Sequence, residues 1–512
     1  MLGSHHRPGR VEQAMSRTSA THVEGESDGR VVPTKGPNVN DGMSTEAPEG
    51  RRPTTENTEQ PTAPRTRSRA GASSALLGVR EVARRDKQTR FTALLHPVTV
   101  GALQASFYAL KRAAAPGVDG VTWAAYATDL EPRLVALHSR VHHGTYRAQP
   151  SKRAYIPKPD GRQRPLGIAA LEDEIVQHAV GTVLNQIDEE DFVGFSYGFR
   201  PGRSPHHALD ALWVGLMRKK VNWVLDADIR GFFDTLDHGW LMTFVEHRIA
   251  DRRILRLVQK WLRAGVSEDG AWSKTEVGTP PGAVISPILA NIFLHYVFDV
   301  WAHRWRRQHA GGDMVIVRYA DDIVLGFEHR RDAERFLAAW QERLASFGLQ
   351  LHPDKTRLND FGRHAADHRK ARGESKPETF DFLGFTHICG TTRKTGRFIV
   401  KRKTIRRRFS AKLAAIKEAL RRRWHESVPM TGRWLRAVVH GHFNYYAVPG
   451  NMDRLNSFRT QVIWRWYRAL RRRGQRRRLT WGRFLRLVDT WIPRARIPHP
   501  HPNVRFDAMH PR

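Results

Sequence analysis

The sequence contains very little cysteine. A single thiol, Cys389, occurs in 512 residues, so an internal disulfide framework and a zinc site built from several cysteines are both excluded. Long apolar runs are missing too, because no stretch approaches the ~20 residues of a membrane span and the N-terminus lacks the apolar core of a signal peptide. We therefore expect a cytoplasmic protein with neither zinc nor a membrane among its partners.

Acidic residues are scarce relative to basic ones. Lys and Arg number 85 against 51 Asp and Glu, which gives a net charge of +34. Nucleic acid is the commonest polyanion that calls for such an excess. After about residue 400, arginine runs recur in apolar helical spacing and are interleaved with Trp and Tyr. The runs are Arg406, Arg407 and Arg408; Arg421, Arg422 and Arg423; and Arg471, Arg472 and Arg473. We expect these arginines to bind RNA, although such runs can also form a solvated helix face.

Aromatic residues are absent from the N-terminal part of the chain. Residues 1–75 contain no Phe, Trp or Tyr and are rich in Ser, Thr, Pro, Gly and Glu, so we expect a disordered tail. Order is expected to begin near residue 76, and from about 153 to 390 helical stretches alternate with short β-type runs, which predicts helices covering a small sheet. Residues 391–480 are expected to form a helical RNA-binding domain. Residues 481–512 are a basic Pro- and His-rich extension, which is more typical of an extended surface strap than of a metal site.

Two adjacent carboxylates, Asp321 and Asp322, separate the apolar runs 314–317 and 323–325. This pattern predicts a β-hairpin with the acids at its turn. Like charges held so close repel each other, and Mg²⁺ relieves the repulsion through oxygen ligands. Taken alone, such a pair is more often only a solvated turn, with roughly one chance in ten of being catalytic.

Another predicted strand ends at Asp228, and a second predicted hairpin, 156–168, carries Lys158, Arg162 and Arg164 in or near its loop. A two-metal phosphoryl-transfer site needs further oxygen ligands, and it needs positively charged side chains that bind the leaving triphosphate. These residues could supply both. Surface acids around a turn and ordinary loop cations remain the alternative.

Eight short motifs occur in the order found in the reverse transcriptases of bacterial group II introns, which the chain resembles from about residue 100 onward. They are Ile156-Pro157-Lys158, Arg164-Pro165-Leu166-Gly167-Ile168, Ser196-Tyr197-Gly198-Phe199-Arg200-Pro201-Gly202, residues 228–233, Ser286-Pro287-Ile288-Leu289-Ala290-Asn291, Tyr319-Ala320-Asp321-Asp322, Lys355-Thr356 and Phe382-Leu383-Gly384-Phe385. The resemblance implies a right-hand polymerase fold of mixed α and β structure. Fingers and a palm with a small antiparallel sheet would occupy residues 76–390, and an α-helical thumb and maturase domain would follow.

The resemblance also assigns roles to individual residues. Asp228, Asp321 and Asp322, with the backbone carbonyl of Ile229, would hold two Mg²⁺ ions, for which Mn²⁺ can substitute. Further roles are assigned outside this metal centre. Lys158 and Arg164 would hold the phosphates of the incoming dNTP, Phe233 would crowd a ribose 2′-OH, Gly282 would lie beneath the template, and Phe382, Leu383, Gly384 and Phe385 would grip the primer. Lys355 is either a general acid for the leaving pyrophosphate or a structural ion pair.

Three residues depart from the family pattern. Pro281 stands where the family usually has Gln, and Glu172 and Glu174 stand where it usually has Arg. Pro281 removes a backbone N–H from the template loop, and the two glutamates are expected to weaken the local positive field for phosphate.

The resemblance implies an RNA-directed DNA polymerase that also assists intron splicing and mobility. Its partners would be intron RNA, an RNA template, a DNA primer or target, and dNTPs. The alternatives are an RNA-binding splicing factor whose polymerase has decayed and a reverse transcriptase recruited to phage defence. With one cysteine, no HNH nuclease domain is expected.

Overall fold

A computed structural model of the chain describes residues 66–157, 163–268, 271–273, 277–279, 282–473 and 479–510. At residues 66–73, 157 and 164 only the backbone is described. Most of the predicted N-terminal tail lies outside these ranges. Within them, no helix is both long and apolar enough to cross a lipid bilayer.

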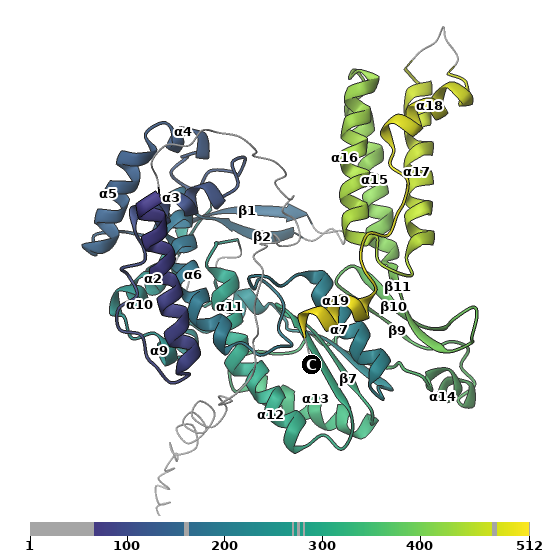
Figure 1. Ribbon diagram of the computed structural model, residues 1–512, viewed down its shortest axis with the longest axis horizontal. Coiled ribbons are helices and arrows are strands. Elements are labelled where there is room, and N and C mark those ends of the chain that lie inside the picture. Colours follow the sequence, from purple (N-terminus) through teal and green to yellow (C-terminus); the bar gives the residue numbers. More distant parts are fainter. Residues whose placement is uncertain are drawn as a thin grey trace, which may run out of the picture.

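A four-stranded antiparallel sheet forms the centre of the fold (Figure 1). Its strand order is β6 (Met314–Tyr319), β7 (Asp322–Phe327), β3 (Trp223–Asp228) and β8 (Arg357–Asp360). β6 and β7 are the two apolar runs around the Asp pair, so the predicted hairpin is confirmed.

Both faces of this sheet are buried. Successive side chains of a strand point to opposite faces, so on β6 Ile316 joins one hydrophobic core and Val315 the other. The first core includes helix α13 (Arg330–Ala345), and the second includes helix α7 (Pro205–Arg218). Burial on both faces explains why these strands read as continuous apolar runs instead of alternating with polar residues.

A second sheet lies beside a group of helices formed by residues before β3. This sheet has the order β2 (Gln163–Ile168), β1 (Ser151–Pro157), β4 (Val266–Glu268) and β5 (Ala271–Ser273), and β1 and β2 form the predicted hairpin. The helices are α2 (Thr66–Arg85), α3 (Val100–Ala109), α4 (Trp123–Ala127), α5 (Leu130–His142) and α6 (Leu171–Asp191). The predicted boundary at residue 76 falls inside α2.

Further helices connect the strands of the central sheet and pack around it. They are α8 (Phe232–Thr235), α9 (His238–Arg248), α10 (Arg252–Arg263), α11 (Ser286–Leu294), the π-helix η1 (His295–Asp299), α12 (Val300–Gln308) and α14 (Ala365–Ala371). The chain therefore combines α and β structure, as its sequence predicts.

The C-terminal part has its own core. A three-stranded sheet in the order β11 (Phe398–Thr404), β10 (Phe385–Thr391) and β9 (Thr379–Phe382) leads into a helical bundle that projects from the rest of the molecule (Figure 1). The bundle helices are α15 (Arg406–Arg422), α16 (Val428–Tyr446), α17 (Met452–Arg471) and α18 (Trp481–Trp491).

The chain then returns to the central sheet. Helix α19 (Pro502–Met509) lies against α7, so the predicted C-terminal strap ends in a docked helix (Figure 1). Asp210 of α7 is buried between Arg402 of β11, at 3.0 Å, and Arg505 of α19, at 2.5 Å. This network ties the last helix, the sheet below the bundle and the central core together.

Candidate active site

The three acids singled out in the sequence meet at one edge of the central sheet. Ala320 and Asp321 form the turn between β6 and β7, and Asp322 begins β7 directly opposite Tyr319. In the pairing of β3 with β7, Asp228 lies opposite Asp322. Antiparallel register thus places the end of one strand beside the hairpin turn, although many residues separate them in the chain.

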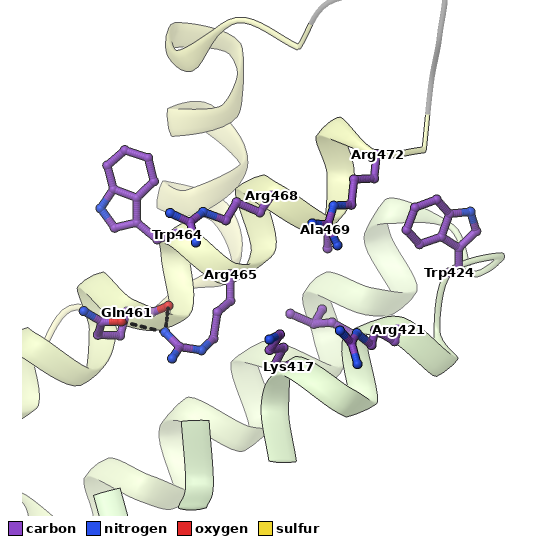
Figure 2. A pocket seen from close by; sticks show the side chains of 10 residues that line it. Lys417, Arg421, Trp424, Gln461, Trp464, Arg465, Arg468, Ala469 and Arg472 are labelled. Atoms are coloured by element: carbon purple, nitrogen blue, oxygen red, sulfur yellow. Dashed lines mark hydrogen bonds between the residues drawn. The ribbon is translucent and has the colours of Figure 1, made fainter. Parts of the chain in front are cut away.

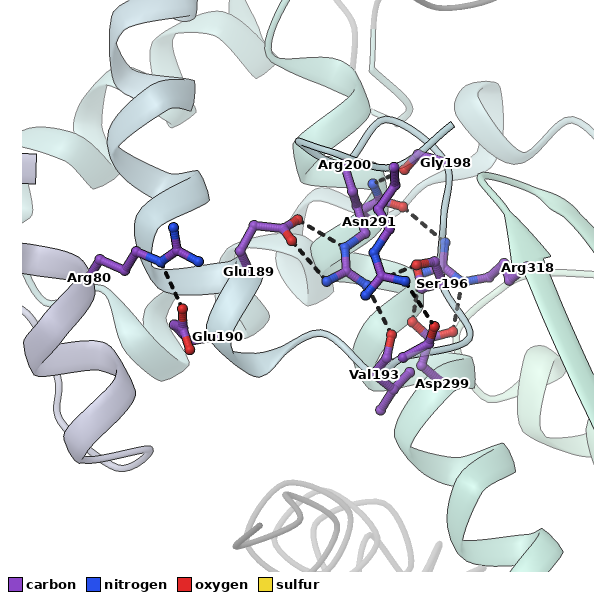
Figure 3. Close-up of polar contacts among 12 residues, drawn as sticks. Arg80, Glu189, Glu190, Val193, Ser196, Gly198, Arg200, Asn291, Asp299 and Arg318 are labelled. Atoms are coloured by element: carbon purple, nitrogen blue, oxygen red, sulfur yellow. Dashed lines mark hydrogen bonds and ion pairs between the residues drawn. The ribbon is translucent and has the colours of Figure 1, made fainter. Parts of the chain in front are cut away.

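A buried arginine anchors this turn from below. The fully buried guanidinium of Arg318 donates to the Asp299 carboxylate at 2.6 and 2.5 Å, to Asn291 Oδ1 at 2.9 Å and to Ser196 Oγ at 2.7 Å (Figure 3). It also donates to the carbonyl of Ala320 at 3.1 Å, inside the turn itself. Because this guanidinium is both charge-paired and fully hydrogen-bonded in a dry site, it fixes the turn rigidly.

A glycine completes the support. Gly198 packs so closely on the turn that a Cβ placed on it would lie 2.2 Å from the nitrogen of Ala320 and 2.8 Å from the carbonyl carbon of Tyr319. Asn291 Nδ2 donates to the carbonyl of Gly198 at 2.7 Å, so the same side chain links this loop to Arg318 (Figure 3). Gly198 and Asn291 lie in two of the sequence motifs, but the sequence assigns neither of them a role, because their contacts join distant parts of the chain.

Carboxylates are crowded at this edge. Burial, and then the charges of Asp322, Asp381 and Asp228, raise the pKa of Asp226 to about 7. The Lys355 ammonium contacts the carboxylate of Asp228, and the amide of His352 donates to the Asp228 carbonyl at 2.8 Å. Lys355 is thus placed as an ion pair with one of the acids, a position from which proton donation is also feasible.

The donor set suits a hard divalent cation. Carboxylate and carbonyl oxygens are the ligands that Mg²⁺ prefers, and the repulsion felt at Asp226 is the kind a cation relieves. The buried Ile229 forms a bridge with Leu351, which holds the backbone just beyond Asp228. Among the residues that the structure describes, however, no three Asp, Glu, His or Cys side chains already converge as ligands of one ion.

The structure describes only some of the residues that are expected to contact the nucleotide. Lys158 and Pro281 lie outside the described residues, and at Arg164, in β2, only the backbone is described. Gly282 has a φ of 115°, and a Cβ there would lie 2.7 Å from the Gly167 carbonyl oxygen. Gly282 is therefore pressed against β2, the strand that carries Arg164.

Phe233 and the Phe382–Phe385 turn, which are expected to contact the sugar and the primer, are both described. Phe233 is half-buried in α8, and its carbonyl accepts from the amide of Thr279 at 2.8 Å. In the turn between β9 and β10, Leu383 and Gly384 have φ values of 43° and 84°, while Phe382, Leu383 and Phe385 are buried. Gly384 is buried as well, so this turn packs into the fold. Tyr445 Oη donates to the Leu383 carbonyl at 2.9 Å, and the amide of Ile405 donates to the Gly384 carbonyl at 3.1 Å.

Comparison with known proteins decides the family. Residues 156–387 match the family model described as reverse transcriptase (RNA-dependent DNA polymerase). The chain is 41% identical to Protein YkfC of Escherichia coli K12 over 280 residues, which cover 48% of this chain and 73% of YkfC. The chain belongs to the reverse transcriptase family. It is also similar to group II intron-encoded protein LtrA of Lactococcus lactis, at 39% identity over 166 residues that cover 32% of this chain and 27% of LtrA.

An intron maturase is a more distant relative. The match to nuclear intron maturase 1 of Arabidopsis thaliana is 26% identical over 96 residues, or 18% of this chain and 13% of that protein. The reverse transcriptase thus spans only a minor share of LtrA and of the plant maturase.

The arginine runs of this reverse transcriptase separate into two groups. Arg423 pairs with Glu426 at 2.5 Å and lies over the ring of Trp434, and Arg473 donates to two backbone carbonyls at 2.7 Å each, so both are engaged in the fold. The other seven are exposed: Arg406, Arg407, Arg408, Arg421, Arg422, Arg471 and Arg472. Exposure suits a contact with RNA, which stays a prediction.

Glu172 has a structural partner that the sequence did not reveal. Both of its carboxylate oxygens accept from Arg140, at 2.9 and 2.8 Å, and Tyr126 Oη donates to it at 3.1 Å. Glu172 and Glu174 also lie in the first turn of α6, where negative charge offsets the positive end of the helix dipole. The expected weakening of a phosphate-binding field is therefore smaller at Glu172 than its formal charge implies.

Proposed function

We propose that this reverse transcriptase extends a DNA primer on an RNA template, using the edge of the central sheet as its catalytic centre. The observation that carries the proposal is the register that places Asp228 opposite Asp322, beside a turn fixed by Arg318 and Gly198. In this assignment the residues up to about 390 are fingers and palm, and the C-terminal bundle is the thumb.

Asp228, Asp321 and Asp322, with the carbonyl of Ile229, would hold two Mg²⁺ ions. When bound, these ions make the primer 3′-OH more acidic and neutralise the leaving pyrophosphate. The protein itself supplies position. Lys158 and Arg164 hold the triphosphate, Phe233 excludes a 2′-OH, and the Phe382–Phe385 turn aligns the primer. These roles follow the family resemblance.

Lys355 is proposed as the proton donor to pyrophosphate. Its ammonium already contacts Asp228, so a structural ion pair is the competing role. A pH–rate profile of Lys355→Met separates the two. Loss of the alkaline limb supports proton donation, whereas an unchanged profile with a lower rate supports the ion pair.

We further propose that the protein binds the RNA of a group II intron and assists its splicing and mobility. The net charge of +34, the exposed arginines of the bundle and the names of two relatives support this proposal. Both proposals are tested with the full-length protein, an RNA template with an annealed DNA primer, dNTPs and Mg²⁺. Extension well above that of the Asp321→Ala variant is expected. Intron binding and splicing without any extension would instead identify a splicing factor that has lost its polymerase.

A further inference from the structure

A basic groove lies between α15 and α17 in the C-terminal bundle (Figure 2). Its volume is about 460 Å³, and no acidic residue is among the described residues that line it. Its cationic lining consists of Lys417, Arg421, Arg465, Arg468 and Arg472. Only two of these positions, 421 and 472, belong to the arginine runs that stand out in the sequence.

Arg465 is the residue that most clearly lacks a counter-charge. Its Nη1 donates to the carbonyl of Gln461 at 3.0 Å and to Gln461 Oε1 at 2.6 Å, both on its own helix. Its Nε is buried and has no hydrogen-bond partner. Burial and the neighbouring Arg468 lower the pKa of Arg465. Within the described part of the chain, no carboxylate lies within 4.0 Å of Arg465, and the nearby Glu418 is engaged with Arg421 and Arg422. A bound anion would remove this imbalance.

Two indoles flank the groove, Trp464 at one end and Trp424 at the other (Figure 2). Trp464 is 45% exposed, although its ring also stacks on Trp481 with centroids 5.0 Å apart and planes 26° apart. A ring held by such a stack is a preorganised platform, and an exposed indole beside phosphate-binding cations can stack on a base.

The size of the groove sets what it can admit. Sites of about 300–1,000 Å³ accommodate small molecules, which is enough for one nucleotide and too little for a duplex. Proteins recognise RNA mostly at unpaired positions, because there the bases can be splayed out and stacked on aromatic rings.

We propose that this groove captures an unpaired nucleotide from a loop or bulge of structured RNA. Lys417, Arg465 and Arg468 hold the phosphate, and Trp464 stacks on the base. The inference rests on the proposed RNA binding and names the form of RNA that this groove takes.

The test measures the Kd of the full-length protein for three labelled hairpins: RNA with a single-nucleotide bulge, the same RNA fully paired, and the bulged hairpin in DNA. The variants are Trp464→Leu and Arg465→Gln, with Arg436→Gln as control. Arg436 is exposed on α16, outside the groove, and its substitution removes the same charge. Circular dichroism melting checks that each variant is folded.

We expect Trp464→Leu and Arg465→Gln to weaken binding of the bulged RNA by roughly 5- to 100-fold, with little change for paired RNA. The control should change neither. Arg465→Gln should also lower the salt dependence of binding by about one phosphate contact, and Trp464→Leu should not. Equal losses on bulged and paired RNA, no loss at all, or a loss confined to DNA would each overturn the inference.

Failure here is distinguishable from failure of the proposed polymerase. On a short template–primer that has a 5′ template overhang but no bulge or loop, both groove variants should extend like the wild type. An enzyme that binds the bulge selectively but extends nothing would leave the groove inference standing and refute the polymerase.

Discussion

Replacing Gly198 with alanine tests whether the catalytic turn is fixed by its packing. The new Cβ would lie 2.2 Å from the nitrogen of Ala320, and ordinary contact begins at 3.4 Å, so the overlap exceeds 1 Å. The atoms of Ala320 and Tyr319 that the Cβ would meet are backbone and cannot rotate away. The turn must therefore move relative to β3, and Asp321 and Asp322 must move with it.

The magnitude follows from this displacement. A misplacement of about 1 Å at a catalytic centre can lower the rate about 100-fold. Overpacking typically costs about 1–3 kcal/mol of unfolding free energy, which is small against the usual stability of a domain. We therefore expect a folded Gly198→Ala protein whose kcat for primer extension is about 100-fold lower.

The assay is single-turnover primer extension at saturating template–primer, well below the melting temperature of each variant. Gly194→Ala is the matched control, because Gly194 lies in the same loop and its Cβ would meet nothing within 4 Å. That variant should keep the wild-type rate within about twofold, as expected for an unobstructed surface change. A Gly198→Ala enzyme with the rate of the control would refute the idea that this contact positions the acids.

Three further predictions concern other parts of the molecule. Asp210→Ala leaves the buried Arg402 without its partner, so urea unfolding should show a loss of about 3–5 kcal/mol, against under 1 kcal/mol for the exposed Asp453→Ala. Burial raises the pKa of Asp173 from 3.8 to about 6, so the folded state increasingly opposes the ionisation of Asp173 as pH rises between these values. Relative to Asp173→Asn, the wild type should therefore lose up to about 3 kcal/mol of unfolding free energy between pH 4 and 6.5, and nothing further above pH 6.5. Gly282→Ala, strained at a φ of 115° and blocked by β2, should raise the KM for dNTP in steady-state extension, and an unchanged KM would contradict a role for this loop at the nucleotide.

Local pattern predicted a good part of this structure. The runs around Asp321 and Asp322 and around Lys158 form hairpins because short apolar runs and turn residues act over a few positions. The supports of the turn were not predictable in this way. Arg318 reaches Ser196 across 122 positions, and Gly198 is required only because the turn happens to lie against it.

The C-terminal extension shows the same limit. Its Pro- and His-rich composition indicates an extended segment, and it does not reveal that Arg505 will meet Asp210, 295 positions earlier. Docking of α19 depends on a buried acid that two separate elements share, and no window of sequence contains that information. The same holds for the basic groove, where Lys417 and Arg465 come from different helices.

The arrangement around Arg318 explains how two adjacent acids can remain at the surface of a stable hairpin. Ala320 has a φ of 55°, a left-handed conformation that costs about 1–2 kcal/mol for a residue with a side chain. Repulsion among the carboxylates adds to that cost. Both costs are offset beneath the turn, where the buried Arg318 donates to Asp299, to Asn291 and to the Ala320 carbonyl. Arg318 thus holds the turn through the Ala320 carbonyl, and we expect the oxygens of Asp321 and Asp322 to serve a metal.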